Sequence, residues 1–167
     1  MDSIDFIIDE IRRSIHGDAW HGPALAEVLA DVRADEAIQR PIAAHSIWEI
    51  ALHATGWIEE VTRRLAGGEP ALPERGDWPA IEDDGEEAWA ETLEALHRAH
   101  EALEATLSRF PAERLGDHVG GSSHDAPLGT GVTFARMLHG LAQHNAYHAG
   151  QVALLKGALR RMKSPAS

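Results

Sequence analysis

The chain has 167 residues, of which 44% are hydrophobic and 25% are charged, and its formal net charge is −12 at pH 7. This length and composition are typical of an ordinary globular protein, so we expect one domain spanning residues 1–167. The negative charge argues against a nucleic-acid partner, because phosphate binding needs a cationic surface.

Two absences narrow the class of protein further. The sequence contains no cysteine, which excludes disulfides, thiolate metal ligands and a protein thiol nucleophile. No apolar run approaches the ~20 residues that a membrane span needs, and the acidic N-terminal segment is unlike a signal peptide. We therefore expect a cytoplasmic protein with no membrane partner.

The first half of the chain has the period of amphipathic helices. A first helix is predicted by isoleucines spaced four, three and four residues apart, at Ile4, Ile8, Ile11 and Ile15, and Ile7 widens this stripe. Gly17 and Asp18 interrupt this pattern, and Pro23 suits the first turn of a second helical stretch. We expect the next helix to run from about Pro41 to Leu65, with an inner side formed by Ile47, Ile50, Ala54, Trp57 and Val61.

The second half of the chain predicts two longer helices. Residues 69–79 contain three prolines and are interpreted as a crossover connection. A helix is expected from about Gly85 to just before Pro111, with an inner stripe of Trp89, Leu93, Leu96, His100, Leu103, Leu107 and Phe110. Residues 111–131 are expected to form a loop. The last helix is expected over residues 132–162, with an inner face of Phe134, Leu138, Leu141, Asn145, His148, Val152, Leu155 and Leu159.

No segment shows the two-residue alternation of a strand, so the predicted fold class is all-α. The four main helices and the proline-rich segment predict a four-helix bundle with one longer crossover between its second and third main helices.

Three of the eleven histidines have positions that suggest a shared ion. His144 and His148 are four residues apart, so on a helix they are neighbours on one face. His148 lies on the predicted inner face, and His53 lies on the buried side of its own helix. A buried polar group without a partner costs about 1–3 kcal/mol, and a metal ion would satisfy all three imidazoles together. Such a three-histidine site leaves coordination positions open.

The alternative interpretation is that each histidine is hydrogen-bonded separately to the backbone or to water, and the spacing alone leaves both interpretations open. Other metal centres fit less well. A di-iron bundle site needs two Glu-x-x-His motifs, and the sequence has one, at residues 94–97. The motif His-Glu-x-x-His is absent, and an i, i+4 pair suits a small ion better than haem.

Several segments together resemble the DinB/YfiT-like superfamily of metal-dependent bacterial proteins. They are W-H-G-P-A-L at residues 20–25, H-S-I-W-E-I-A-L-H-A-T-G-W at 45–57, R-L-A-G-G at 64–68 and H-G-L-A-Q-H-N-A-Y-H-A-G-Q at 139–151. The resemblance spans most of the chain. It implies an up-down-down-up four-helix bundle that forms a homodimer, with a divalent ion held by His53, His144 and His148.

The resemblance also implies an activity. Similar proteins use low-molecular-weight thiols such as bacillithiol or mycothiol in transferase or isomerase reactions, and others resemble metal-dependent hydrolases. The expected cofactors are therefore a divalent ion (Zn²⁺, Ni²⁺, Fe²⁺ or Mn²⁺) and a thiol cosubstrate, and the expected partner is a small-molecule substrate. The alternatives are a non-catalytic metal-binding protein and a metal-free, stress-related dimeric bundle.

Further residues are candidates for supporting roles. Glu49 lies one helical turn before His53, where it would act as a catalytic general base or orient an imidazole, although a salt-bridged carboxylate fits the same position. Gln151 and Tyr147 lie within one turn of His148 and are candidates for lining the site. His100, on an apolar stripe, is either a hydrogen-bonded core residue or part of a pocket wall.

Overall fold

The structure is a computed structural model that describes residues 3–42, 45–120 and 131–163. Within these ranges the secondary structure is helical, apart from one isolated β-bridge between His118 and Thr133. The elements are α1 (Ser3–His16), α2 (Leu25–Leu29), α3 (Ala34–Ala37), α4 (Ile47–Leu65), α5 (Glu86–Leu107), the 3₁₀ helix η1 (Ala112–Gly116) and α6 (Phe134–Lys163). The predicted all-α class is confirmed.

The buried faces of the long helices follow the predicted periodicity. In α1, Ile11 and Ile15 of the predicted stripe are buried together with Ile7, whereas Ile4 and Ile8 are only partly buried against the core. Every residue of the inner face predicted for α6 is buried, including Asn145 and His148. The stripe of α5 is buried as well, except that Leu93 is only partly covered. These faces join buried side chains of α2 and α4 in one hydrophobic cluster.

The start of α4 differs from its prediction, which placed it near Pro41. The helix begins at Ile47 because Ser46 and Glu49 form a capping box: Ser46 Oγ accepts from the Glu49 amide at 3.2 Å, and Glu49 Oε2 accepts from the Ser46 amide at 2.7 Å. A short helix, α3, precedes it. The end of α4 at Leu65 agrees with the prediction, and Gly67 follows with a φ of +94°.

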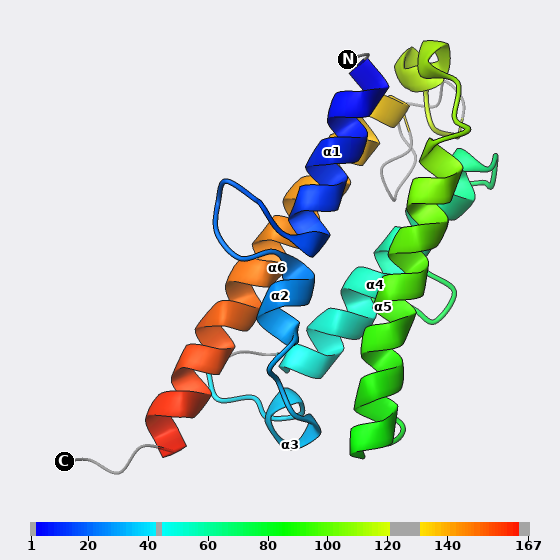
Figure 1. Ribbon diagram of the computed structural model, residues 1–167. Coiled ribbons are helices and arrows are strands. Elements are labelled where there is room, and N and C mark those ends of the chain that lie inside the picture. The colour runs from blue at the N-terminus through cyan, green and yellow to red at the C-terminus, as the bar shows by residue number, and fades with distance from the viewer. Residues whose placement is uncertain (1–2, 43–44, 121–130, 164–167) are drawn as a thin grey trace.

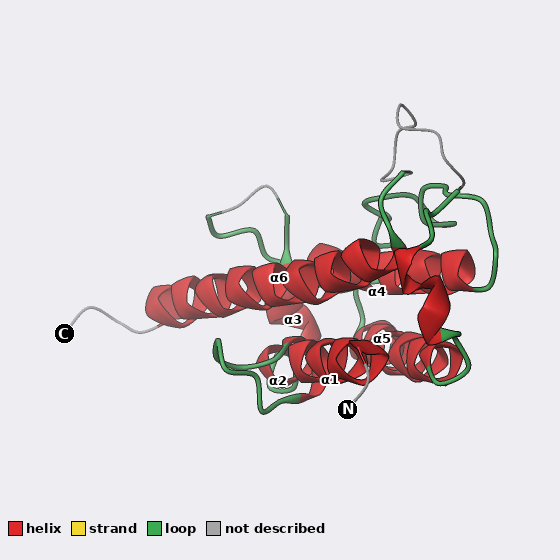
Figure 2. Ribbon diagram, turned by 90° about the horizontal axis from the view of Figure 1, so that it is seen from above, coloured by secondary structure: helices red, strands yellow, loops and turns green. Residues whose placement is uncertain are grey.

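The four long helices lie side by side in two layers. Figure 2 shows α4 and α6 in one layer and α1 and α5 in the other. α4 contacts both α5 and α6, and α1 contacts both α6 and α5. In Figure 1, α4 and α5 run in the same direction, and α1 and α6 run in the opposite direction. Residues 66–85 must therefore return along the molecule to connect the end of α4 with the start of α5.

This crossover connection is attached to α4 by a buried carboxylate. Glu60 Oε1 accepts from Arg64 Nε at 2.7 Å and from the backbone amide of Ala71 at 2.9 Å. Arg64 also donates to the carbonyl oxygen of Ala71 at 3.0 Å. These hydrogen bonds hold the crossover against α4, on which His53 lies. Among the described helices, none is long and apolar enough to span a membrane.

Candidate metal centre

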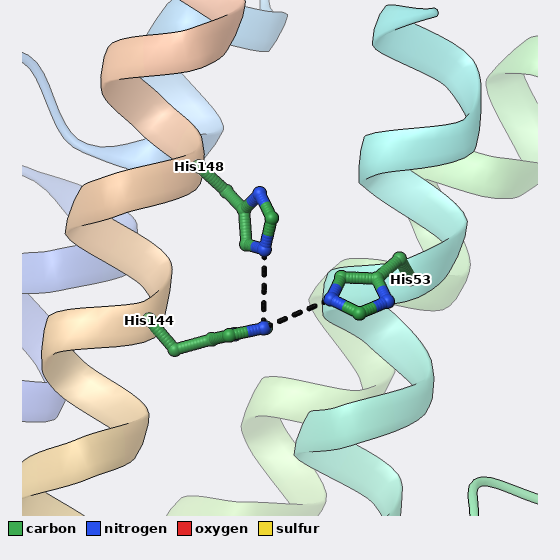
Figure 3. A group of neighbouring side chains, drawn as sticks. All are labelled: His53, His144 and His148. Atoms are coloured by element: carbon green, nitrogen blue, oxygen red, sulfur yellow. Dashed lines mark hydrogen bonds between the residues drawn. The ribbon is translucent and has the colours of Figure 1, made fainter. Parts of the chain in front are cut away.

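The three histidines singled out in the sequence lie together between α4 and α6. His53 projects from α4, and His144 and His148 project from successive turns of α6 (Figure 3). His144 Nε2 is 3.0 Å from His53 Nε2 and 3.1 Å from His148 Nε2. The three candidate ligand atoms all lie within 4.8 Å of one another. The same nitrogen of each ring therefore faces a common point.

The other nitrogen of His53 is held by the crossover connection. His53 Nδ1 donates to the carbonyl oxygen of Asp77 at 2.6 Å. A carbonyl oxygen can only accept, so the hydrogen is on Nδ1 and Nε2 carries the lone pair. Trp78 stacks on the His53 ring with centroids 3.9 Å apart, and His45 stacks on Trp78 at 3.6 Å. Trp57 Nε1 donates to Asp77 Oδ1 at 2.8 Å. This hydrogen bond holds Asp77, whose carbonyl oxygen accepts from His53, in place.

His148 is oriented from within its own helix. Its Nδ1 donates to Gln151 Oε1 at 2.7 Å, and Gln151 Nε2 donates to the hydroxyl of Tyr147 at 3.1 Å. The amide orientation of Gln151 thus places the hydrogen of His148 on Nδ1 and the lone pair on Nε2. Both residues predicted to lie beside the site do so. Hydrogen bonds of this kind fix the ring orientation of metal-binding histidines.

Burial keeps two of the three imidazoles neutral. The exposed fraction is 6% for His53 and 4% for His148. Burial, together with the neighbouring imidazoles, lowers the pKa of both His144 and His148 to about 4. At neutral pH these two rings are therefore uncharged, which is the form that binds a metal ion.

The donor set fits a divalent cation. The lone pairs of His53 and His148 both face His144 Nε2, and that atom carries one hydrogen at most. Hydrogen bonds among the three rings therefore satisfy only one of the two nitrogen–nitrogen contacts. A cation accepts lone pairs from all three nitrogens, and all-imidazole ligation suits zinc, nickel or iron.

Glu49, the predicted catalytic residue, lies at the start of α4 and is engaged there. Besides its part in the capping box, its Oε2 accepts from Arg40 Nε at 2.9 Å. Burial alone would raise its pKa, but the hydrogen bonds from Arg40 and Ser46 outweigh that effect and hold the pKa of Glu49 below its usual value. Its Oε2 lies 4.0 Å from Nδ1 of His45, which is not a member of the triad. The geometry supports the alternative of a salt-bridged, structural carboxylate.

The structure also shows the positions of His100 and Trp57, which the sequence assigned to inner helix faces. His100 is a core residue on α5 whose Nδ1 shares a hydrogen bond of 2.9 Å with His16 Nε2. Trp57 is partly exposed and contacts the site through Asp77 instead of packing in the core.

Sequence reasoning missed three residues near the triad: Asp77 and Trp78 of the crossover connection, and His45, which precedes α4. Asp77, Trp78 and His45 lie in segments without helical periodicity, so their orientation has no signal in the sequence. Residues 69–79 contain one tryptophan and three acidic residues, and nothing in the sequence marks Trp78 and Asp77 as neighbours of His53.

Comparisons with known proteins agree with this architecture. A family model described as the DinB superfamily matches residues 19–152. A crystal structure described as a conserved protein from Enterococcus faecalis has a similar fold, with a TM-score of 0.65, 18% sequence identity, and coverage of 95% of this chain and 97% of that chain. No curated protein matches the sequence. Because the family model covers well over half of its length, the chain belongs to the DinB superfamily.

Proposed function

We propose that this protein is a metal-dependent enzyme in which His53, His144 and His148 hold one divalent ion. The observation that carries the proposal is the approach of His53 Nε2 and His148 Nε2 to His144 Nε2, at 3.0 and 3.1 Å. The hydrogens of His53 and His148 are fixed on the opposite ring nitrogen. We propose that this metal site lies in an up-down-down-up bundle formed by α1, α4, α5 and α6. The ligands belong to α4 and α6, which contact each other.

A divalent ion with three neutral ligands keeps its full charge, lowers the pKa of a bound water or thiol and polarises a substrate oxygen. Asp77 and Gln151 orient two of the three rings through their Nδ1 hydrogens. Trp78 covers one face of His53 and excludes water from it. Gln151 and the hydroxyl of Tyr147 lie beside His148, where they can hydrogen-bond a small polar substrate.

The reaction class that we propose is thiol-dependent transfer or hydrolysis of a small molecule. Membership of the DinB superfamily supports a metal-binding protein, and the absence of cysteine is compatible with a thiol that arrives as cosubstrate. The test is a screen of protein loaded with Zn²⁺, Ni²⁺, Fe²⁺ or Mn²⁺, in which thiols are paired with electrophiles and esters are offered alone. Turnover that is lost in His148→Ala supports the proposal.

A second candidate function is a bound ion without turnover. The burial of His53 and His148 favours it, because access to the ion would be restricted. In that case the protein binds one ion per chain, yet the same screen gives no turnover above that of His148→Ala.

We further propose that the protein is a homodimer. Tyr147 and Leu154 are seven residues apart on α6, so they share one face of the helix, and their exposed fractions are 64% and 66%. Analytical ultracentrifugation tests this: a dimer that becomes a monomer in Leu154→Asp supports it, and a wild-type monomer contradicts it.

A further inference from the structure

The third ligand, His144, differs from the other two because its Nδ1 has no partner within hydrogen-bonding geometry in the described part of the chain. This nitrogen is buried. The same is true of Asn145 Oδ1, on the next residue of α6, where the side chain is 0% exposed. Buried polar atoms without partners are uncommon in folded proteins. Two of them on adjacent residues, one of which is a candidate metal ligand, require a physical explanation.

The orientation of the Asn145 amide is fixed from α1. Asn145 Nδ2 donates to Ser14 Oγ at 3.2 Å, and Ser14 Oγ donates to the carbonyl oxygen of Ile11 at 2.7 Å. Since the Ser14 hydroxyl uses its hydrogen on Ile11, it can only accept from Asn145. The amide nitrogen of Asn145 therefore faces α1, and its oxygen can accept a hydrogen bond from another donor.

His144 supplies that donor when its Nε2 binds a cation. A neutral imidazole has one hydrogen, and an Nε2 that gives its lone pair to an ion must carry the hydrogen on Nδ1. Asn145 is the next residue along α6, and its Oδ1 is buried and has no partner among the described residues. It is thus the neighbouring side chain with an oxygen to accept this hydrogen.

We infer that Asn145 is a positioning residue of the metal centre: its oxygen, preset by Ser14 of α1, accepts the Nδ1 hydrogen of His144 in the metal-bound protein. Each ligand then has its own acceptor, namely Asp77 for His53, Gln151 for His148 and Asn145 for His144. The contact also extends the metal site to a third helix, because Ser14 belongs to α1. This inference rests on the proposed three-histidine site and adds a residue to it.

The test compares Zn²⁺ affinities by competition with a chelator. Asn145→Leu removes the accepting oxygen and is expected to weaken binding about 10–100-fold, the usual effect of losing a partner that orients a ligand. Asn145→Asp keeps an acceptor, so its affinity should equal or exceed that of the wild type. Ser14→Ala leaves the oxygen in place but frees the amide to rotate, so its affinity should lie between the two.

Thr92→Val is the matched control for general destabilisation. Thr92 is also a buried polar residue, and it accepts from Trp48 Nε1 at 3.0 Å, away from the triad. This variant should be less stable to denaturant and bind Zn²⁺ as the wild type does. Affinities are compared only among variants whose circular dichroism shows a folded protein. Asn145→Ala replaces Asn145→Leu if the leucine does not fit.

A second readout reports directly on the hydrogen. Long-range ¹H–¹⁵N spectra of the Zn²⁺-loaded protein should show His144 with hydrogen on Nδ1, slow to exchange in the wild type and in Asn145→Asp but fast in Asn145→Leu. Wild-type affinity in Asn145→Leu, or Zn²⁺ bound through Nδ1 of His144, would overturn the inference while leaving the three-histidine site intact. A wild-type protein that binds no Zn²⁺ would overturn both.

Discussion

The chemistry of a histidine in this protein is set by its surroundings. His97 is exposed on α5 beside Glu101, whereas His53 and His148 are buried and have one nitrogen fixed by a hydrogen bond. The sequence placed His53, His144 and His148 on facing sides of two helices, because helical periodicity gives the phase of each residue. It gave no information on which ring nitrogen faces the others, because that depends on Asp77 and Gln151.

The role of Gln151 leads to a prediction for a single side chain. Gln151→Leu removes the acceptor of the His148 Nδ1 hydrogen, so metal affinity should fall about 10–100-fold. Gln151→Glu keeps an acceptor at the same place and should bind at least as tightly as the wild type. Competition with a chelator measures both. Equal affinities in all three proteins would show that Gln151 does not orient His148.

The lowered pKa of His100 predicts that the stability of the protein depends on pH. Burial, as the main cause, and the neighbouring His16 lower its pKa to about 4, while Arg12 on α1 and His97 and Glu104 on α5 are the other charged or titratable groups that act on it. In the unfolded chain a histidine has a pKa of about 6.5, so between pH 6.5 and 4 the unfolded state binds more protons than the folded state. The free energy of unfolding should therefore decrease as pH falls through this range.

Each such group contributes up to about 1.4 kcal/mol per pH unit. Urea denaturation at pH 7 and at pH 4.5 measures the loss, and His100→Gln should lose less stability between these two values than the wild type. His144 and His148, whose pKa values are also lowered to about 4, account for part of the remaining dependence. An unchanged pH dependence in His100→Gln would contradict this assignment.

At the scale of elements, the sequence predicted the buried faces best where hydrophobic residues repeat with the period of a helix. The long stripes of α5 and α6 predicted the buried faces, because a helix repeats its phase every few residues. The shorter stripe of α1 did so in part, since Ile11 and Ile15 are buried but Ile4 and Ile8 are only partly covered. The start of α4 was placed too early, although the capping-box pattern at Ser46 and Glu49 is visible in the sequence. The crossover connection has no repeating phase, so the approach of Trp78 and Asp77 to His53 had no signal in the sequence.

The two roles considered for Glu49 make different predictions. As a capping residue, its replacement in Glu49→Ala should lower the free energy of unfolding by about 1 kcal/mol, since caps contribute about 0.5–2 kcal/mol. Metal affinity should stay at the wild-type value, because the carboxylate is bound by Ser46 and Arg40. Denaturation and chelator competition on the same samples separate the two effects. Weakened metal binding with an unchanged free energy of unfolding would contradict the capping role and indicate that Glu49 acts at the metal site.

At the scale of the whole molecule, the metal site joins parts that are distant in the sequence. The ligands lie on α4 and α6, and the crossover connection is fixed to His53 through Asp77 and Trp78. An ion that binds only the folded protein stabilises it by mass action, by about 2.7 kcal/mol at a hundred times the dissociation constant. Binding at this one place should therefore stabilise the entire fold.

The expected consequence is a higher melting temperature. For a chain of this length, stabilisation by about 2.7 kcal/mol raises Tm by about 5–10 °C. Calorimetry with and without excess Zn²⁺ measures the shift, and His97→Ala, which changes an exposed histidine on α5, should show the same shift as the wild type. A shift that persists in His53→Ala would place the ion elsewhere.

The central claim is that three histidines hold one ion. Elemental analysis of untagged protein after equilibrium dialysis against Zn²⁺, Ni²⁺, Fe²⁺ or Mn²⁺ tests it most directly. We predict one tightly bound ion per chain for at least one of these metals, and loss of that ion in each of His53→Ala, His144→Ala and His148→Ala. A wild-type protein that retains no ion, or single variants that retain it fully, would contradict the claim.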